Sequence, residues 1–560
     1  MLSVTQNRVF EIAFSSGKRY ADPFNDVTLD VIFTDPEGRA QRVPAFWSGE
    51  MTWRARYASP RTGAHSYRTV CSDESNADLH GRAGELEVVP YEGGAPPAGA
   101  NPLLQHGRLR VGAPTAGRGD RRHLEHEDGT PFFWLGDTWW FGLVKRLTWP
   151  GDFQRLTADR VAKGYNLVQL VAGLYPDVYQ FDPRGANEGG YPWTEGYRAI
   201  NPAYFDAMDL RIEWLVRSGI VPCIVGAWGF YIKYAGPGVM KKHWRNLVAR
   251  YGAYPTVWCV AGEAVMHFYT ENFGPDHVAY ARQAWTDVMR YLRDTDPYHN
   301  PITIHPTAPD SRAMINDASL LDVDMLQTSH GYGAMENTVR YVMDAVAGGA
   351  PPASGAPPAG EPPLPVVDGE PMYEGIMGQC WHDMSRFCFW VCMMSGAAGH
   401  TYGANGMWQM STPEEPCIAI SGSWGDTTWE EASRLAGSAH VGIGRRILER
   451  YEWWRFQPRV EPEWDFDKRM SPFAAGIPGE VWMFYMVSDG LPGRYHGMMG
   501  KTIRIEPGAK YRAKFINPRT GADVEVGPIK ADGDGAWPLP RKPSREDWVL
   551  AIEGAGKRRR

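Results

Sequence analysis

The chain has 560 residues, of which 43% are hydrophobic and 22% charged, a composition typical of a globular protein rather than a disordered one. Its net charge of -7 gives no reason to expect nucleic acid as a partner. The seven cysteines are scattered without a CxxC pair, which argues against a full disulfide framework. At this length we expect two to four domains.

The N-terminal stretch lacks the charged region and the apolar core of a signal peptide. We therefore expect a cytoplasmic protein, or a secreted form whose signal has been removed. The longest apolar stretch, Phe387 to Ala398, is too short to span a bilayer and predicts a buried helix. No membrane is expected as a partner.

Both ends of the chain have β-character. Residues 1–92 alternate in hydrophobicity with turn signals between the runs, which predicts an N-terminal β-sandwich. A Gly/Ala/Pro-rich linker follows at 92–102. Residues 455–554 return to the β pattern and predict a C-terminal β-sandwich.

Between these ends, residues 103–454 alternate strands with helices, which predicts a catalytic domain of α/β class. Eight strands with about eight helices match a (β/α)₈ TIM barrel. The alternative is an open doubly wound sheet, which the absence of a GxGxxG turn after the first strand disfavours. The expected strands are Phe132–Gly136, Leu167–Ala172, Val221–Val225, Thr256–Val260, Ile302–His305, Met325–Thr328, Pro365–Asp368 and Gly399–Tyr402.

Two of these strands end in a glycine followed by a glutamate. The run Thr256 to Val260 leads to Gly262-Glu263, and the strand within LPVVDGEPMYEG leads to Gly369-Glu370. A carboxylate at a strand end packs poorly, and the preceding glycine lets a substrate approach. Two such carboxylates suit an enzyme that cleaves a glycosidic bond. The alternative is that both are ordinary surface glutamates.

Polar and aromatic residues follow the other strands as well. Because the active residues of a (β/α)₈ barrel come from the carboxyl ends of its strands, these side chains form a candidate sugar site. In strand order, the ring consists of Asp137, Trp139 and Trp140, then Tyr175, Trp228, Glu263, His305, His330 and Tyr332, Glu370 and Glu374, and finally Tyr402, Asn405 and Trp408.

Several members of the ring have structural alternatives. Asp137 could cap a helix or orient the rim, and the Trp139–Trp140 pair could plug the barrel mouth. His305 and His330 together suggest a metal pair, but no HExxH, DxDxDG or paired CxxC motif supports one, so we expect neither metal nor cofactor. The absence of a GxSxG elbow or a P-loop disfavours esterases and NTPases.

Five motifs carry a family resemblance: FFWLGDTWW, GYNLVQL at 164–170, the AGE of the fourth strand, DGEPMYEG and GAAGHTYGANGMW. Together they resemble the apiosidase-like (DUF4038-type) glycoside hydrolases, which are related to the larger clan of retaining (β/α)₈ glycosidases. The front β-domain resembles the DUF5060 module, and the C-terminal segment is similar to the collagen-binding-like β-sandwich that often follows such barrels.

The resemblance implies an acid/base at the end of the fourth strand, which matches Glu263, and a nucleophile at the end of the seventh, which matches Glu370. Glu374 is the rival nucleophile, although it follows Pro371 in the loop. Many clan members carry Asn before the acid, where it contacts the sugar 2-hydroxyl. This chain has Gly262 there.

The resulting expectation is a retaining, exo-acting glycoside hydrolase with a carbohydrate substrate, and a pentose such as apiose or arabinofuranose follows from the resemblance. Two alternatives remain: a non-catalytic carbohydrate-binding protein on the same barrel, and a metal-dependent hydrolase. The flanking β-domains leave three roles open: binding polysaccharide, extending the wall of the active site, or holding a homo-oligomer together.

Overall fold

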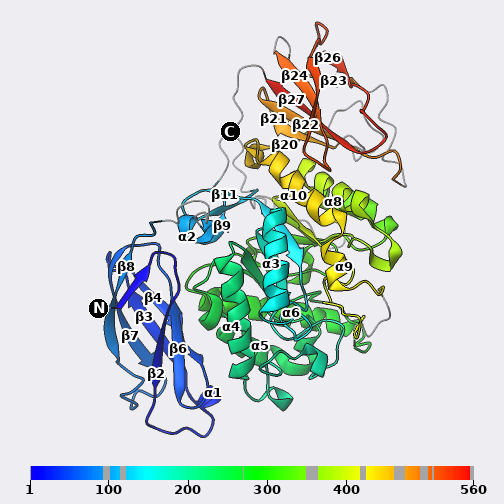
Figure 1. The fold of residues 1–560 in the computed structure, drawn as a ribbon. Helices are drawn as coiled ribbons and strands as arrows, with labels where there is room; N and C mark the ends of the chain where they lie inside the picture. Colours follow the sequence, from blue (N-terminus) through cyan, green and yellow to red (C-terminus); the bar gives the residue numbers. More distant parts are fainter. Residues whose placement is uncertain are drawn as a thin grey trace.

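The computed structural model describes residues 2–92, 101–113, 122–268, 270–348, 364–416, 424–459, 473–491, 502–506 and 510–554. Figure 1 shows three parts: a β-domain in blue at the N-terminus, a central α/β part, and a β-domain in orange and red near the C-terminus. The central part lies between the two β-domains.

The N-terminal domain is a sandwich of two sheets. One sheet has the order β1-β8-β7-β3-β4 and the other the order β2-β6-β5. Alternate residues of β7 and β8 are buried, as expected for strands with one face on a core. The elements are β1 (Leu2–Thr5), β2 (Phe10–Ser15), α1 (Pro23–Asp26), β3 (Leu29–Thr34), β4 (Ala40–Pro44), β5 (Phe46–Trp47), β6 (Thr52–Tyr57), β7 (Gly63–Cys71) and β8 (Ala83–Val89).

The central part is a parallel eight-stranded barrel, and its strands are buried along their whole length. Their order is β16-β15-β14-β13-β12-β19-β18-β17, so the first strand pairs with the last. This cyclic order confirms the predicted barrel and makes the doubly wound alternative wrong. The strands are β12 (Trp134–Thr138), β13 (Leu167–Val171), β14 (Val221–Val225), β15 (Val257–Cys259), β16 (Ile302–Thr303), β17 (Asp324–Gln327), β18 (Val366–Glu370) and β19 (Gly399–Tyr402).

Helices cover the outside of the barrel, with one departure from strict alternation. Between β16 and β17 the described chain forms the short 3₁₀ turns η3 (Ser311–Met314) and η4 (Ala318–Leu320) in place of an α-helix. Asp310 and Asp317 cap these turns. The helices are α3 (Gly151–Lys163), α4 (Pro202–Arg217), α5 (Tyr231–Tyr251), α6 (Asp276–Thr295), α7 (Met335–Val346), α8 (His382–Met394), α9 (Trp429–Ser433) and α10 (Ala436–Leu448).

Shorter elements complete the connections. A small sheet of order β11-β10-β9 joins the N-terminal domain to the barrel and follows a one-turn helix. These elements are α2 (Pro102–His106), β9 (Leu109–Val111), β10 (Leu124–His126) and β11 (Pro131–Phe132). The remaining 3₁₀ turns are η1 (Pro183–Gly185), η2 (Glu195–Tyr197), η5 (Tyr332–Ala334), η6 (Ile376–Gly378) and η7 (Trp453–Arg455).

The N-terminal domain is attached to the barrel through α4 and α5. Arg56 of β6 pairs with Asp209 of α4 at 2.5 Å. Arg250 of α5 lies 4.1 Å from the ring centroid of Phe46, an arrangement favourable for a cation–π contact. Two barrel-side residues, Ala253 and Tyr298, belong to the core of this domain. The domain is therefore a fixed neighbour of the barrel wall rather than a tethered module.

The C-terminal domain contains a six-stranded sheet, β20-β21-β22-β27-β24-β25, and a two-stranded sheet, β23-β26. One face of the larger sheet shares a hydrophobic core with the barrel. Helix α8 lies between them, which explains why Met384 to Met394 are all buried. The strands are β20 (Gln457–Arg459), β21 (Phe473–Ile477), β22 (Val481–Met486), β23 (Thr502–Arg504), β24 (Tyr511–Ile516), β25 (Asp523–Pro528), β26 (Ala536–Pro538) and β27 (Trp548–Gly554).

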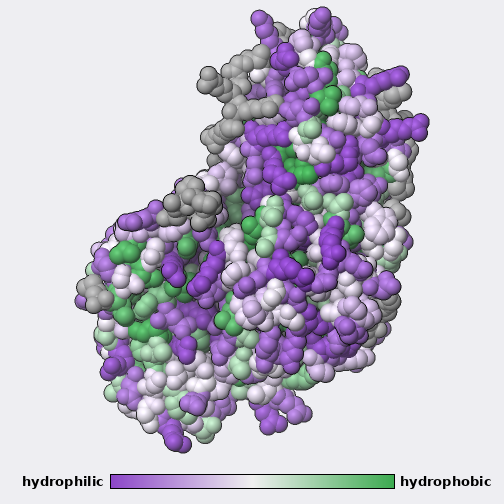
Figure 2. All heavy atoms as spheres, viewed as in Figure 1, coloured by the Kyte–Doolittle hydropathy of each residue, from purple (hydrophilic) through white to green (hydrophobic). Residues whose placement is uncertain are grey.

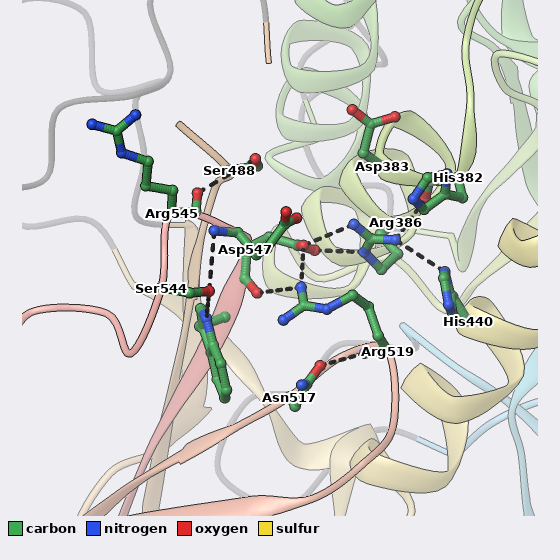
Figure 3. A network of polar contacts seen from close by, with 12 residues as sticks. His382, Asp383, Arg386, His440, Ser488, Asn517, Arg519, Ser544, Arg545 and Asp547 are labelled. Carbon is green, nitrogen blue, oxygen red and sulfur yellow. Dashed lines mark hydrogen bonds and ion pairs between the residues drawn. The ribbon is translucent and has the colours of Figure 1, made fainter. Parts of the chain in front are cut away.

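A buried polar network joins α8 to this C-terminal sheet (Figure 3). Asp547, just before β27, accepts hydrogen bonds from Arg386 Nε and Nη2 at 2.8 and 2.9 Å. It also accepts them from Arg519 Nη1 at 2.8 Å and from the Tyr485 hydroxyl at 3.1 Å. Arg386 reaches His440 of α10 at 2.9 Å. The Arg386 and Asp547 side chains are each only 1% exposed, so the pair lies inside the interface.

The outer surface is mainly polar. On the face seen in Figure 2, hydrophilic residues dominate and apolar residues gather only in small groups. Scattered apolar groups of this kind are ordinary for a folded surface. In the part of the chain that the structure describes, no helix combines the length and the apolar character needed to cross a membrane.

Candidate active site

A cavity of about 430 Å³ opens at the carboxyl ends of the barrel strands. Both predicted catalytic glutamates line it, together with four more members of the predicted ring: Trp140, Trp228, His330 and Trp408. This is the position that the barrel architecture predicts for a site. The lining residues that sequence reasoning missed are Pro176, Asp177, Met266, Phe268, Thr307, Gln327, Ser329, Tyr373, Ile376 and Trp424.

Glu263 lies just beyond β15 and is held by two neutral donors. Trp228 Nε1 donates to its Oε2 at 3.2 Å, and Gln327 Nε2 donates to its Oε1 at 3.1 Å. The side chain is 7% exposed, and the backbone φ of +43° is uncommon for a residue with a side chain. Such strained backbone is often found at functional sites. The chain thus fixes this carboxyl at the cavity wall.

The glycine before this glutamate has a steric cause. A Cβ added at Gly262 would lie 2.2 Å from a ring carbon of Trp228, so no larger residue fits under that ring as it stands. An isolated parallel bridge joins the backbones of the same two residues. The ring of Trp228 therefore occupies space that an asparagine at position 262 would need, and its Nε1 supplies a donor to Glu263 instead.

Glu370 is the last residue of β18 and lies against two histidines. Its Oε1 is 3.0 Å from His330 Nε2, and its Oε2 is 3.0 Å from His305 Nε2. Burial by itself raises the pKa of Glu370, but the contacts with the two histidines outweigh it and hold the pKa well below its ordinary value. The Trp140 ring stands edge-on to His305, with centroids 5.4 Å apart. The two histidine contacts therefore keep Glu370 ionised.

Tyr373 completes the wall next to this nucleophile candidate. Its hydroxyl accepts a hydrogen bond from Trp140 Nε1 at 3.2 Å, and its ring lies 4.5 Å from that of His330. Burial raises the pKa of Tyr373, and the nearby charge of Glu370 raises it further, so the phenol stays protonated. Tyr373 also lines the cavity.

A third carboxyl group in the cavity, Asp177, lies in the long loop after β13. It is 7% exposed and has a φ of +55°. Burial, followed by the negative charges of Glu263 and Glu370, raises the pKa of Asp177 to about 7. Three carboxyl groups therefore act on one another across one cavity. No local sequence pattern indicates that Asp177, in this long loop, belongs to the site.

Replacing Asp177 should give a pH-dependent gain in stability. Its folded pKa of about 7 lies above the unfolded value of roughly 3.9, so its charge costs stability at pH 8 and costs nothing below about pH 4. At pH 8 the free energy of unfolding of Asp177→Asn should therefore exceed that of wild type by on the order of 1–3 kcal/mol, and the variant should unfold at a higher temperature. At pH 4 the two proteins should be equally stable. Differential scanning fluorimetry at both pH values measures this.

Asp182, five residues further on in the same loop, is the matched control. Burial raises the pKa of Asp182, but its contacts with Arg184 outweigh it and lower the pKa. Asp182→Asn should therefore give no gain at pH 8, since the charged form is the favoured one in the folded protein. An equal gain in both variants would contradict the assignment of a destabilising charge to Asp177.

Glu374 does not line the cavity, which removes the structural basis for treating it as the rival nucleophile. Its Oε2 accepts from the Tyr402 hydroxyl at 2.5 Å, and its Oε1 accepts from the Gly437 amide at 3.1 Å. It is 1% exposed, and burial raises its pKa. Its role is to join the loop after β18 to β19 and to α10.

The polar groups of three more expected substrate contacts form hydrogen bonds inside the protein. Asp137 is fully buried and accepts from Arg160 Nε at 2.5 Å and from Trp139 Nε1 at 2.7 Å. Tyr175 shares a hydrogen bond with the Tyr204 hydroxyl at 2.7 Å. None of Asp137, Trp139 and Tyr175 lines the cavity. The structural alternative holds for Asp137, which anchors α3 to the rim.

The remaining members of the ring fall into three groups. Tyr402 and Asn405 are buried and lie outside the cavity lining. His305 is likewise fully buried and acts on the cavity through Glu370. The side chain of Tyr332 lies outside the part of the chain that the structure describes.

His305 and His330 both contact Glu370, and the three-ligand group that the described residues offer to a metal ion does not include them. Elsewhere in the described chain, single ligand atoms of Asp368, Cys392 and His400 lie within 4.8 Å of one another. Burial raises the pKa of the Cys392 thiol, which disfavours the thiolate that a metal binds. This cluster lies among β18, β19 and α8 and does not line the cavity. The absence of a metal stays a prediction.

Comparison with known families decides the identity of this barrel. The family model for the apiosidase-like catalytic domain matches residues 118–455, more than half of the chain. The chain belongs to the apiosidase-like family. This apiosidase-like chain is thus a glycoside hydrolase with a carbohydrate substrate, and the resemblance seen in its motifs is confirmed. A second model, a domain of unknown function named DUF5060, matches residues 3–72. No curated protein matches.

Solved structures share the fold of this apiosidase-like chain. A candidate glycoside hydrolase from Bacteroides vulgatus ATCC 8482 is 17% identical, with a TM-score of 0.69, covering 99% of this chain and 100% of its own. A glycoside hydrolase family 5 structure from the same organism is 21% identical, with a TM-score of 0.63 and coverage of 81% and 95%. A further glycoside hydrolase is 22% identical, with a TM-score of 0.63 and coverage of 82% and 99%. At these identities the likeness concerns the fold.

Proposed function

We propose that this protein hydrolyses a glycosidic bond with retention of configuration, with Glu370 as nucleophile and Glu263 as acid/base. The observation that carries the proposal is the unequal surroundings of the two carboxyls in one cavity. Glu370 is held ionised by two histidines, whereas Glu263 accepts hydrogen bonds from the neutral N–H groups of Trp228 and Gln327. A nucleophile must be ionised and an acid must carry a proton. The two histidines favour the ionised form of Glu370 more strongly than neutral N–H donors favour that of Glu263, so of the two carboxyls Glu370 suits the nucleophile and Glu263 the acid.

The reaction would proceed in two displacements. Glu370 attacks the anomeric carbon while the bond to the leaving oxygen breaks, and Glu263 gives its proton to that oxygen. A glycosyl ester on Glu370 results. Water then attacks the same carbon and loses a proton to Glu263, which restores both carboxyls. Tyr373 lines the same cavity as Glu370, and the charge of Glu370 contributes to keeping its phenol protonated.

The cavity supports action on a terminal sugar. Its volume of about 430 Å³ lies near the lower end of small-molecule pockets. Phe268 and Trp424 line it from the loops after β15 and β19. This shape suits one sugar and part of a leaving group better than the interior of a polymer. A pentose, such as apiose or arabinofuranose, is proposed from membership of the family.

The deciding experiment is the stereochemistry of the first product. Wild-type protein is incubated with a panel of aryl glycosides that includes D-apiosides, L-arabinofuranosides and D-xylosides, and the anomeric signals are followed by proton NMR. Retention in the sugar first released supports two displacements. Inversion would contradict the role of Glu370 as nucleophile and would require a base that activates water instead. Binding without release of any sugar would favour a carbohydrate-binding protein.

Removing the acid should affect substrates unequally. Glu263→Ala should slow hydrolysis of a poor leaving group such as methanol by about 10²–10⁴-fold, because that oxygen needs a proton as the bond breaks. A dinitrophenolate leaves without a proton, so its rate in the first displacement should fall far less. The kcat/KM values of wild type and variant on the two substrates measure this. Equal losses on both would contradict the acid role.

Removing a histidine should shift the acid side of the pH profile. His305 and His330 lower the pKa of Glu370, so His330→Gln should raise it. Since Glu370 must be ionised to attack, kcat/KM of the variant should begin to fall at a higher pH than in wild type. The profile between pH 3 and pH 8 tests this, with activity at pH 7 as the internal reference. An unmoved acid limb would refute the electrostatic role of His330.

A further inference from the structure

Asp177 differs from the other carboxyls around the cavity in its lack of a partner. Glu263 has two N–H donors, Glu370 has two histidines, and Glu374 has a tyrosine hydroxyl and a backbone amide. Within the described residues, no hydrogen bond or ion pair reaches the side chain of Asp177, and the influences on it are burial and the two neighbouring glutamates. It is nevertheless 93% buried and lines the cavity.

An unpartnered buried carboxyl destabilises a protein, so its place in a cavity calls for a ligand that completes it. The loop holds Asp177 at a φ of +55°, in the left-handed region that Asp enters more readily than most residues. A carboxyl group offers two oxygens, which can accept hydrogen bonds from adjacent hydroxyls. Sugar hydroxyls are donors of this kind.

The charges of the lining narrow the ligand further. Three carboxyls, Asp177, Glu263 and Glu370, lie around the cavity. The described lining residues include no Lys or Arg that could receive a carboxylate on the substrate. An acidic sugar would therefore meet repulsion without compensation, whereas a neutral sugar would not.

We propose that Asp177 is the specificity-determining residue of the cavity, where it accepts hydrogen bonds from hydroxyls of a neutral terminal sugar and discriminates against uronic acids. This inference rests on the proposed function, because it takes the cavity as the sugar site. It assigns to Asp177 a contact with the substrate rather than a part in the bond-breaking steps, which remain with Glu263 and Glu370.

The test couples a change in the protein to a change in the sugar. From the panel, the best neutral aryl glycoside is compared with its monodeoxy derivatives, each lacking one hydroxyl, in wild type, Asp177→Asn and Asp177→Ala. Asp177→Ala should lower kcat/KM on the parent glycoside by about 10²-fold. At one hydroxyl position, removal of the hydroxyl should lower the kcat/KM of wild type by a similar factor and should not lower that of Asp177→Ala any further. Asp177→Asn should lie between them.

The matched acidic substrates complete the kinetic test. A D-glucuronide is a D-xyloside with an added carboxylate, so wild type should discriminate against the 4-nitrophenyl glucuronide relative to the xyloside, and Asp177→Asn should discriminate less. A structural role would lower all rates in parallel, without coupling to any one hydroxyl. The proposal would be overturned if, at every hydroxyl position, the loss from the Asp177 substitution and the loss from the missing hydroxyl multiplied independently. A glucuronide cleaved as fast as the xyloside would also overturn it.

Sugar binding separates this inference from the proposed function. Titration calorimetry of Glu370→Gln and of Glu370→Gln/Asp177→Ala with D-xylose, D-apiose, L-arabinose and D-glucuronic acid needs no turnover. At least one neutral sugar should bind Glu370→Gln about tenfold more tightly than the double variant. If wild type hydrolyses nothing but this difference is present, the proposed function fails and the inference stands. Equal affinity in both proteins, or no binding of any neutral sugar, overturns the inference.

Discussion

Glu370→Gln should lower kcat by at least about 10³-fold, while Glu374→Gln, four residues further on, should retain most of the wild-type rate. Glutamine keeps the shape of Glu370 but cannot form the glycosyl ester. Glu374 is held by the Tyr402 hydroxyl and the Gly437 amide and does not line the cavity, so its charge has no part in the chemistry. Steady-state kinetics on the best aryl glycoside compares the two variants.

Both variants change one carboxylate to an amide in the same loop region, which makes them a matched pair. Circular dichroism and thermal unfolding should show that each is folded before the rates are compared. A large loss in Glu374→Gln with activity kept in Glu370→Gln would transfer the nucleophile to Glu374. It would also require the loop after β18 to move in the working enzyme, since Glu374 is 1% exposed in the present structure.

Asp547→Ala should be the most destabilising of the proposed changes, by about 3–5 kcal/mol. It removes the carboxylate that both Arg386 and Arg519 contact and leaves Arg386 buried between α8 and the C-terminal sheet without its ion-pair partner (Figure 3). The cost of an unpaired buried charge exceeds that of a lost surface pair. Thermal unfolding of wild type and variant at pH 7 measures the change.

Asp489→Ala is the control in the same domain. Asp489 pairs with Lys542 at 2.7 Å but is 48% exposed, so its loss should cost about 0–1 kcal/mol. Comparable shifts in the two variants would mean that the Asp547 network is no more than a surface contact in energetic terms. A double variant, Arg386→Met with Asp547→Leu, should recover part of the lost stability, because it removes the buried charges together with their desolvation cost.

The barrel and the placement of Glu263 and Glu370 at one cavity could be predicted because they depend on local patterns. Buried parallel strands are continuous apolar runs, and β15 and β18 belong to runs of this kind that lead to Gly262-Glu263 and Gly369-Glu370. The strand-end rule then places both carboxyls on one face without knowledge of any long-range contact. Trp140, Trp228, His330 and Trp408 follow from the same rule and line the cavity.

Contacts between distant segments could not be predicted, because no local pattern carries them. Asp137 lies near the end of β12 as Glu263 lies just beyond β15, but Arg160 of the following helix, α3, binds its carboxylate. Asp177 lies six residues beyond the end of β13, in a loop whose course depends on packing against its neighbours. Gln327 ends β17 and was passed over because an amide carries no catalytic signature, although it holds Glu263 in place.

The missing helix between β16 and β17 has a simpler cause. The segment contains Pro306 and Pro309, and the aspartates Asp310 and Asp317 each accept from a backbone N–H close by. Such side-chain bonds compete with helix propagation and favour single turns. The strict alternation of strands and helices in a (β/α)₈ barrel therefore does not hold in this segment.

The close contact of Gly262 with the Trp228 ring couples substitutions at the two positions. Asparagine cannot enter position 262 while the ring is in place, since even a Cβ would lie 2.2 Å from it. Shrinking Trp228 first removes the Nε1 donor that holds Glu263. Each single change should disturb the wall of the cavity, so the effects of changing the two residues should not be additive. Laboratory evolution toward asparagine at position 262 would therefore have to change both codons at once.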